Sequence, residues 1–167
     1  VVANAASALS TEIADYYVQA RHVPADQVLR LQLPVAEEII RERYTAAIES
    51  AVGQWLTSHA AQDRILYIVL TKDVPFRIIG TGGVNGTVAS VDSELALLYR
   101  KLVGISAAAS GPVKNPYFAG DGGLEAAKPF THRMFDLYLV TRLDGYTVAD
   151  VKGLIDRGMA PSREGVV

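Results

Sequence analysis

The feature that most constrains the fold is the run ILYIVL at residues 65–70. This segment has the length of a strand and is apolar at every position, so neither of its faces suits contact with water. A strand of this kind belongs in the centre of a parallel sheet that is covered by helices on both sides. The rest of the chain must therefore supply further strands and two layers of helices.

Patterns on both sides of this run predict those elements. Short apolar runs predict strands at residues 1–5, 28–33 and 138–143, and residues 75–79 predict an edge or extension strand after the central one. Apolar residues at intervals of three and four predict helices at 10–23, 44–59, 90–102 and 147–155. The expected N-caps are Ser10, Ser90 and Thr147, the last in a capping box with Asp150. Alternating strands and helices predict a three-layer α/β sandwich with a mostly parallel sheet, caspase-like or flavodoxin-like in strand order.

Composition limits the class of protein. The 167 residues suit a single α/β domain, and the formal net charge of −2 gives no general attraction to nucleic acid or anionic lipid. The absence of cysteine excludes disulfides, thiolate metal sites and a cysteine nucleophile within this chain. No apolar run approaches the roughly 20 residues of a membrane span. We therefore expect no nucleic-acid partner and no membrane span.

The two ends predict a segment of a longer protein. Residues 1–5 are apolar without an initiator methionine, and residues 165–167 read as the start of another buried strand. Natural proteins usually cover a strand edge of this kind. We expect residues 1–167 to form one domain or the N-terminal subdomain of a longer chain, with its own C-terminal half or another protein as partner.

Several familiar motifs are missing. The glycine-rich segment 80–89 has Asn85 where a dinucleotide fingerprint needs its third glycine, and it has no P-loop lysine. His22, His59 and His132 show no metal-ligand spacing, and no G-x-S-x-G elbow occurs. The sequence thus predicts no cofactor and no metal centre, and it contains no catalytic constellation.

Charged residues follow the predicted strands and form the candidate binding site: Asp73, Arg77, Asp92, Glu94, Arg142 and Asp144. Ligands of open α/β sheets collect at the carboxyl ends of strands, where such groups bind a divalent cation or a substrate amine. A structural role is the alternative. Asp92 and Glu94 suit a helix N-terminus, and Asp144 before Gly145 suits a turn.

Three stretches resemble gingipain-like cysteine peptidases, which have a caspase-like fold. ILYIVLTKDVP resembles their central strand and Asp-x-x-Pro turn, SVDSELALLY their Ser-Asp-x-x-Tyr segment, and VTRLDGYTVADVKGLIDR their Gly-Arg-Leu-Pro strand end with its Thr-capped helix. Asp73, Asp92 and Arg142 match motif positions, whereas Lys72 and Thr141 replace glycines and Asp144 replaces the proline. The family's catalytic histidine and cysteine belong to the part of the fold after this helix. The resemblance therefore assigns no catalytic residue to this chain.

The opening VVANAASALSTEIADYYVQARHVP resembles an uncharacterised bacterial family of conserved hypothetical proteins, which implies an exported protein without an assigned activity. Our leading hypothesis is a non-catalytic scaffold or binding segment. The alternatives are the N-terminal half of a caspase-like hydrolase with its Cys/His pair beyond residue 167, and a small-molecule or divalent-metal-binding domain.

Overall fold

The computed structural model describes residues 1–80, 89–105, 113–118 and 128–160. The chain divides into two compact units. Unit 1 contains residues 1–37, 69–75 and 142–167, and unit 2 contains residues 38–68 and 76–141. The described residues leave out most of the glycine-rich segment 80–89, much of residues 104–131, and residues 165–167, for which a strand start was predicted.

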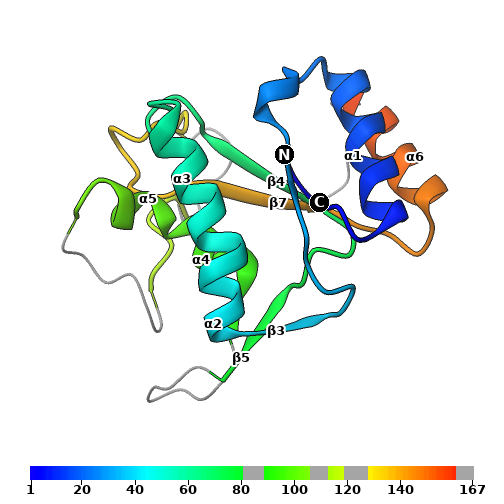
Figure 1. The fold of residues 1–167 in the computed structure, drawn as a ribbon. Helices are drawn as coiled ribbons and strands as arrows, with labels where there is room; N and C mark the ends of the chain where they lie inside the picture. The colour runs from blue at the N-terminus through cyan, green and yellow to red at the C-terminus, as the bar shows by residue number, and fades with distance from the viewer. Residues whose placement is uncertain (81–88, 106–112, 119–127, 161–167) are drawn as a thin grey trace. The chain divides into compact units, whose positions relative to one another are not determined.

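The main sheet is four-stranded and parallel, in the order β2-β1-β4-β7 (Figure 1). Its strands are β1 (Val2–Asn4), β2 (Leu29–Leu31), β4 (Tyr67–Thr71) and β7 (Leu139–Leu143). Val2 pairs with Leu29 on one side and with Leu70 on the other. This is the order of the first four strands of the flavodoxin-like arrangement. The predicted α/β class with a parallel sheet flanked by helices is confirmed, and it is consistent with a three-layer sandwich.

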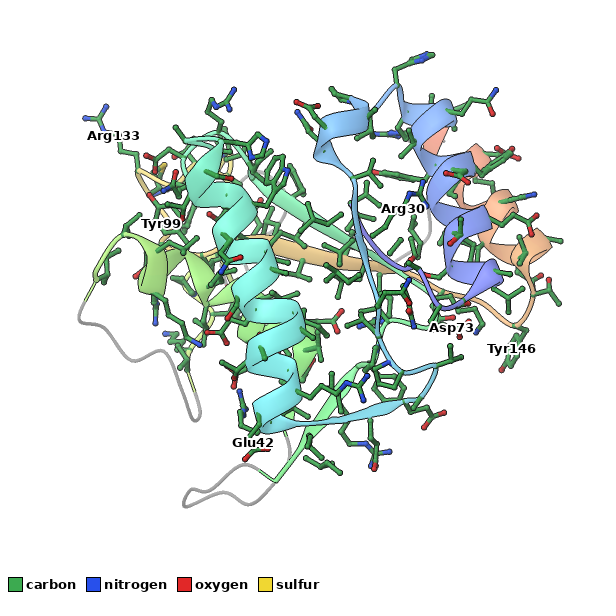
Figure 2. All side chains as sticks on the ribbon, in the orientation of Figure 1. Arg30, Glu42, Asp73, Tyr99, Arg133 and Tyr146 are labelled. Carbon is green, nitrogen blue, oxygen red and sulfur yellow. The ribbon has the colours of Figure 1, made fainter. Side chains whose placement is uncertain are left out.

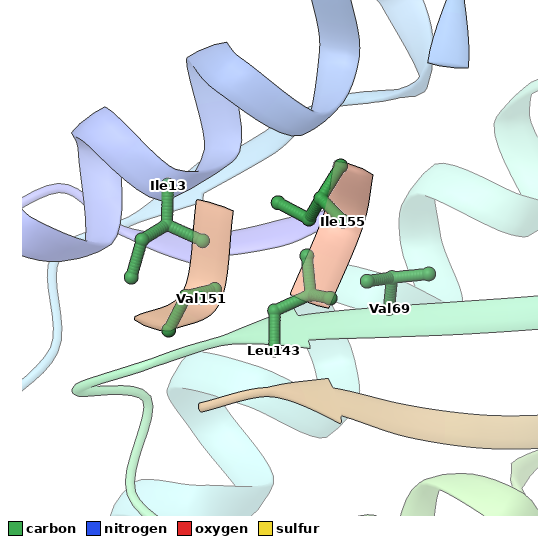
Figure 3. Packing of buried hydrophobic residues seen from close by; sticks show 5 residues of the cluster. All are labelled: Ile13, Val69, Leu143, Val151 and Ile155. Atoms are coloured by element: carbon green, nitrogen blue, oxygen red, sulfur yellow. The ribbon is translucent and has the colours of Figure 1, made fainter. Parts of the chain in front are cut away.

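Two helices of unit 1, α1 (Ala8–Arg21) and α6 (Val148–Met159), pack against each other. Five buried residues from these helices and from the sheet form the core (Figure 3): Ile13, Val69, Leu143, Val151 and Ile155. The i, i+4 pair on α6 therefore places two branched side chains on the face that contacts the strands. A short 3₁₀ turn, η1 (Ala25–Gln27), precedes β2.

The cap of α1 differs from the prediction. Ser7 is the N-cap, with extended backbone and a side chain that accepts a hydrogen bond from Ser10 N–H. Ser10, the predicted cap, lies buried in the first turn and bonds elsewhere. The other predicted caps are confirmed: Ser90 accepts from Ser93 N–H, and Thr147 forms a capping box with Asp150.

Unit 2 has a second sheet in the order β3-β5-β6. Its strands are β3 (Glu38–Ile40), β5 (Arg77–Ile79) and β6 (Ala89–Ser90), with β5 parallel to β3 and antiparallel to β6. The strand predicted at residues 75–79 is present as β5, but it is the middle strand of this second sheet rather than an edge or extension strand after the central one. Strands of three residues are too short to show the alternation of apolar and polar residues by which a strand is recognised in sequence.

One continuous helical segment of unit 2 consists of α2 (Arg41–Tyr44), the π-helical turn η2 (Thr45–Glu49) and α3 (Ser50–Ser58). Its buried large side chains recur at intervals of four: Tyr44, Ile48, Val52 and Leu56. In a regular α-helix such a spacing rotates around the axis by about 40° at each step. The wider π turn reduces this rotation and keeps the side chains on one face.

The predicted helix after Ser90 is divided in two. The helices are α4 (Val91–Ala96) and α5 (Leu98–Leu102), and Leu97 lies between them. Within the described residues, no helix has the length and apolar character that crossing a membrane requires.

Candidate functional site

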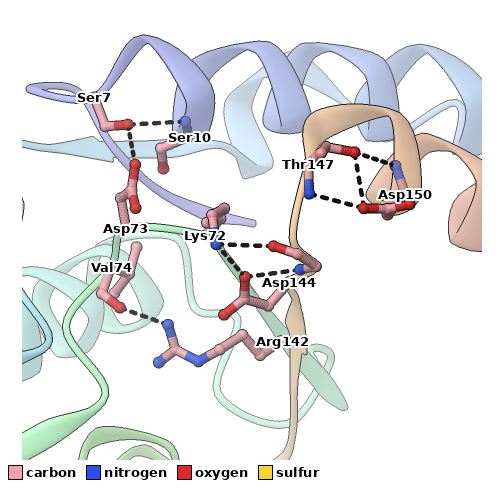
Figure 4. A network of polar contacts seen from close by, with 10 residues as sticks. Ser7, Ser10, Lys72, Asp73, Val74, Arg142, Asp144, Thr147 and Asp150 are labelled. Carbon is pink, nitrogen blue, oxygen red and sulfur yellow. Dashed lines mark hydrogen bonds and ion pairs between the residues drawn. The ribbon is translucent and has the colours of Figure 1, made fainter.

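The six predicted site residues fall into two groups. Asp73, Arg142 and Asp144 belong to unit 1, at the carboxyl ends of β4 and β7. The other three belong to unit 2: Arg77, Asp92 and Glu94. We call the polar residues at and around the strand ends of unit 1 the carboxyl edge: Asn4, Ser7, Ser10, Thr71, Lys72, Asp73, Arg142 and Asp144. Figure 4 labels all of these except Asn4 and Thr71.

Asn4, the last residue of β1, fixes the backbone of the loops around it. Its side chain is fully buried. The amide nitrogen donates to Asp73 O at 2.8 Å and to Pro34 O at 3.3 Å, and Oδ1 accepts from Ala6 N–H at 3.0 Å and Leu33 N–H at 3.2 Å. One side chain thus binds backbone groups in three loops, which secondary structure alone leaves without partners.

Asp73 has a left-handed backbone, with φ of 64°. Its carboxylate accepts a 2.5 Å hydrogen bond from the hydroxyl of Ser7 (Figure 4), and its backbone carbonyl is the group that Asn4 binds. Non-glycine residues seldom adopt this conformation, although aspartate and asparagine tolerate it better than most. The contacts from Ser7 and Asn4 hold Asp73 in this turn.

Two buried hydroxyl groups connect α1 with the end of β4. Ser10 Oγ and Thr71 Oγ1 are 2.6 Å apart, and both residues are fully buried. Ser10 Oγ also accepts from Asn4 N–H at 2.8 Å. These contacts tie the first turn of α1 to the ends of β1 and β4.

Lys72 and Asp144 form an ion pair of 2.8 Å. Lys72 also donates to Gly145 O at 2.9 Å, and Gly145 N–H donates to Asp144 Oδ1 at 2.8 Å. Partial burial raises the pKa of Asp144, but the hydrogen bonds from Lys72 and Gly145 outweigh it and leave the pKa below its ordinary value. The same pair raises the pKa of the Lys72 ammonium, mainly through its hydrogen bond to Asp144.

Arg142 binds backbone carbonyls of this unit. Its guanidinium donates to Val74 O at 2.5 Å and to Pro75 O at 3.3 Å. It therefore fixes the segment that follows Asp73. The loop after Asp144 ends in the capping box of α6 and includes Tyr146, whose side chain is fully exposed (Figure 2).

In unit 2, Arg77 and Glu94 form ion pairs between neighbouring elements. Arg77 lies 3.2 Å from Glu38 on the adjacent strand, and both side chains are more than a third exposed. Glu94 lies 2.8 Å from Arg41 and 3.6 Å from Lys101, and its own side chain is largely covered. These contacts give Glu94 a packing role between helices.

Asp92 lies on the wall of a cavity of about 470 Å³ in unit 2. The cavity is bounded by α4, residues 113–116 and the beginning of β7. The sequence pointed to Asp92, but the cavity itself follows from the strand and loop positions, which no local pattern indicates.

In sequence His132 lies four residues before Asp136, but its ring binds a backbone carbonyl. Its Nε2 donates to Ile65 O at 2.7 Å, and its ring stacks on Tyr99 with 4.1 Å between centroids. Asp136 instead receives two hydrogen bonds from Arg100, at 2.9 and 3.0 Å. Burial, together with a hydrogen bond to Asp63, raises the pKa of Tyr99 to about 12. The stacked rings and these hydrogen bonds give Tyr99 and His132 a packing role within unit 2.

The residues of the carboxyl edge form hydrogen bonds with one another and with the surrounding backbone. Among the residues that the structure describes, no three His, Cys, Asp or Glu side chains are grouped so as to hold a metal ion. Comparison with protein-family models, curated proteins and solved structures found no match to this chain.

Proposed function

We propose that this chain is a non-catalytic scaffold or binding segment, in which the carboxyl edge fixes the loops that follow the strands of unit 1. The observation that carries the proposal is the buried side chain of Asn4, which binds backbone groups of three separate loops. Lys72 and Arg142 also bind backbone carbonyls. Groups used in this way position the chain around them.

The contacts of Ser7 support a scaffold role over a nucleophilic one. The hydroxyl donates a hydrogen bond to the carboxylate of Asp73, and as the N-cap of α1 it accepts one from Ser10 N–H. A serine nucleophile requires a base that can take its proton at neutral pH, most often histidine. In the described part of the chain, His22 is the C-cap of α1, and His59 and His132 bond to backbone carbonyls.

A small polar ligand at the carboxyl edge is the second candidate function. The left-handed backbone of Asp73 favours it, because unusual backbone conformations cluster at ligand-binding sites. Such a ligand would meet alternating charges along this edge, with the Lys72 ammonium beside the Asp144 carboxylate. Side chains kept for a ligand often lower the stability of the free protein.

The stability of Asp73→Asn decides between the two. Asparagine keeps the shape and tolerates the left-handed backbone, but its neutral oxygen accepts a weaker hydrogen bond from Ser7. A scaffold role predicts a loss of about 1 kcal/mol in the free energy of unfolding, measured in urea. A ligand site predicts an unchanged or increased free energy of unfolding, because a charge kept for a ligand lowers the stability of the free protein.

A double-mutant cycle with Ser7→Ala assigns the loss to the contact. The scaffold role predicts a coupling of about 0.5–1.5 kcal/mol between the two positions, since Ser7→Ala removes the hydrogen bond that Asp73→Asn weakens. Asp15→Asn is the matched control. Asp15 is exposed on α1 and pairs with Arg30 at the surface, so its loss changes stability by less than about 0.5 kcal/mol. Zero coupling between Ser7 and Asp73 contradicts the scaffold proposal.

A further inference from the structure

The loop between β7 and α6 contains a chemically reactive pair of residues, Asp144 followed by Gly145. Among the aspartates that the structure describes, Asp144 alone precedes a glycine. The backbone nitrogen of the next residue can attack an aspartate carboxyl group, and a side chain on that residue hinders the attack. Glycine has no side chain, so Asp144 is the least hindered of these aspartates.

The packing of α6 requires the glycine. A β-carbon at position 145 would lie 3.1 Å from Asp150 Cβ and 3.1 Å from Val151 Cγ2, which is closer than such atoms normally approach. Gly145 therefore allows the loop to lie close to the first turn of the helix. A larger residue would make the pair less reactive, but it does not fit unless these neighbours shift.

The geometry also brings the reacting groups together. Gly145 N–H donates to Asp144 Oδ1 at 2.8 Å, so the nitrogen lies against the carboxyl group that it would attack. The side chain of Asp144 is 47% exposed, and residues 144–147 have no regular secondary structure. Water therefore has access to the carboxyl group.

Lys72 opposes the reaction. Attack requires the neutral carboxylic acid, because its hydroxyl must leave as water. Partial burial favours this acid form, but hydrogen bonds from Lys72 and Gly145 outweigh the burial and keep the pKa of Asp144 below its ordinary value. Arg142 adds a further positive charge in the same direction. Lys72 also donates to Gly145 O at 2.9 Å, which holds Gly145 in place.

We infer that Asp144 and Gly145 form a site of isoaspartate formation, and that the ion pair with Lys72 keeps the reaction slow. Gly145 N bonds to Asp144 Cγ and loses its proton, and the carboxyl hydroxyl leaves as water, which gives a cyclic succinimide. Water then adds to either ring carbonyl and breaks the bond between that carbon and nitrogen. Breakage at Cγ restores aspartate, whereas breakage at the former backbone carbonyl leaves isoaspartate, with no net change in mass or oxidation state.

The test is to incubate the full chain at body temperature and neutral pH for several weeks and to quantify isoaspartate at position 144. Trypsin releases this position in residues 143–152, and a synthetic peptide that contains isoaspartate identifies the altered form by its chromatographic retention. Lys72→Met removes the charge and is expected to raise the rate at least about threefold, since the acid fraction changes about tenfold for each unit of pKa. Lys72→Arg keeps the charge and is expected to react more slowly than Lys72→Met.

Thr147→Ala is the matched control. It removes the N-cap of α6 and so loosens the same loop, but it leaves the ion pair of Lys72 in place. We expect its rate to lie below that of Lys72→Met. The inference is overturned if Lys72→Met fails to reach the expected increase at position 144, or if Thr147→Ala or Lys72→Arg reacts as fast as Lys72→Met.

Discussion

Replacing Asn4 by alanine tests how much of the stability of unit 1 depends on one side chain. Asn4 is fully buried and takes part in four side-chain hydrogen bonds with Asp73, Pro34, Ala6 and Leu33. Alanine keeps the strand but removes all four. Of the backbone groups that lose their partners, the N–H of Leu33 is buried, whereas those of Asp73, Pro34 and Ala6 are partly covered.

The expected loss follows from these contacts. Each hydrogen bond contributes about 0.5–1.5 kcal/mol, and a buried group that loses its partner costs about 1–3 kcal/mol. Two of the four bonds, at 3.2 and 3.3 Å, are longer than the usual 2.9–3.0 Å and count for less. We therefore expect Asn4→Ala to lose about 3–4 kcal/mol, a large part of the roughly 5–15 kcal/mol of a typical domain.

Urea unfolding followed by far-ultraviolet circular dichroism measures this loss. Gln19→Ala is the matched control, because it removes an exposed amide from α1 and is expected to change stability by less than about 0.5 kcal/mol. A loss below about 1 kcal/mol for Asn4→Ala, with an unchanged dependence on urea, would refute the reasoning. It would show that water or neighbouring groups replace the four contacts.

Three further predictions concern single groups. The stability that the lowered pKa of Asp144 contributes is present above about pH 4 and is lost as pH falls through that pKa; Asp144→Asn should therefore flatten the acid side of a urea-stability profile. Thr147→Ala removes the N-cap of α6 and should lower the free energy of unfolding, measured in urea, by about 1 kcal/mol. Thr147→Ser keeps a hydroxyl that can cap the helix and should retain most of that stability. Tyr99 should ionise near pH 12 rather than near pH 10. In a titration followed by phenolate absorbance, Tyr99→Phe should therefore lack one step near pH 12 that the unsubstituted chain shows. Identical titration curves for the two proteins, up to the pH of unfolding, would contradict this.

The sequence predicts the main sheet well because its signals are local. The apolar run at 65–70 and the strand at 138–143 each stand between helical patterns, and both lie in the parallel sheet. The second sheet is missed because β3 and β5 have three residues each and one fully buried residue apiece, Ile39 and Ile78. Three positions are too few to reveal an alternating pattern. The pairing of these strands also depends on residues that are distant in sequence.

The site is predicted only in part, for a similar reason. Position after a strand places Asp73 and Asp144 at the carboxyl ends of β4 and β7, where the structure has them, because strand ends of one sheet lie together. Asn4 and Ser7 were missed, although a polar residue ending an apolar strand is a weak signal that the sequence does contain. Their importance comes from burial and from contacts with residues about 30 and 66 positions away, which no local pattern encodes.

The π turn at Thr45–Glu49 makes the helix of unit 2 tolerant of a change in length at that point. Such a turn accommodates one residue more than a regular α-helical turn, in the manner of an insertion. Deleting one residue there would restore regular winding and keep the helix faces before and after the turn nearly in register, because the π turn already absorbs that residue. Tyr44 would then stay on the buried face that Ile48 and Leu56 share. A single deletion in this turn should therefore be less harmful than one in the regular turns of α3, which would rotate all residues before it by about 100°.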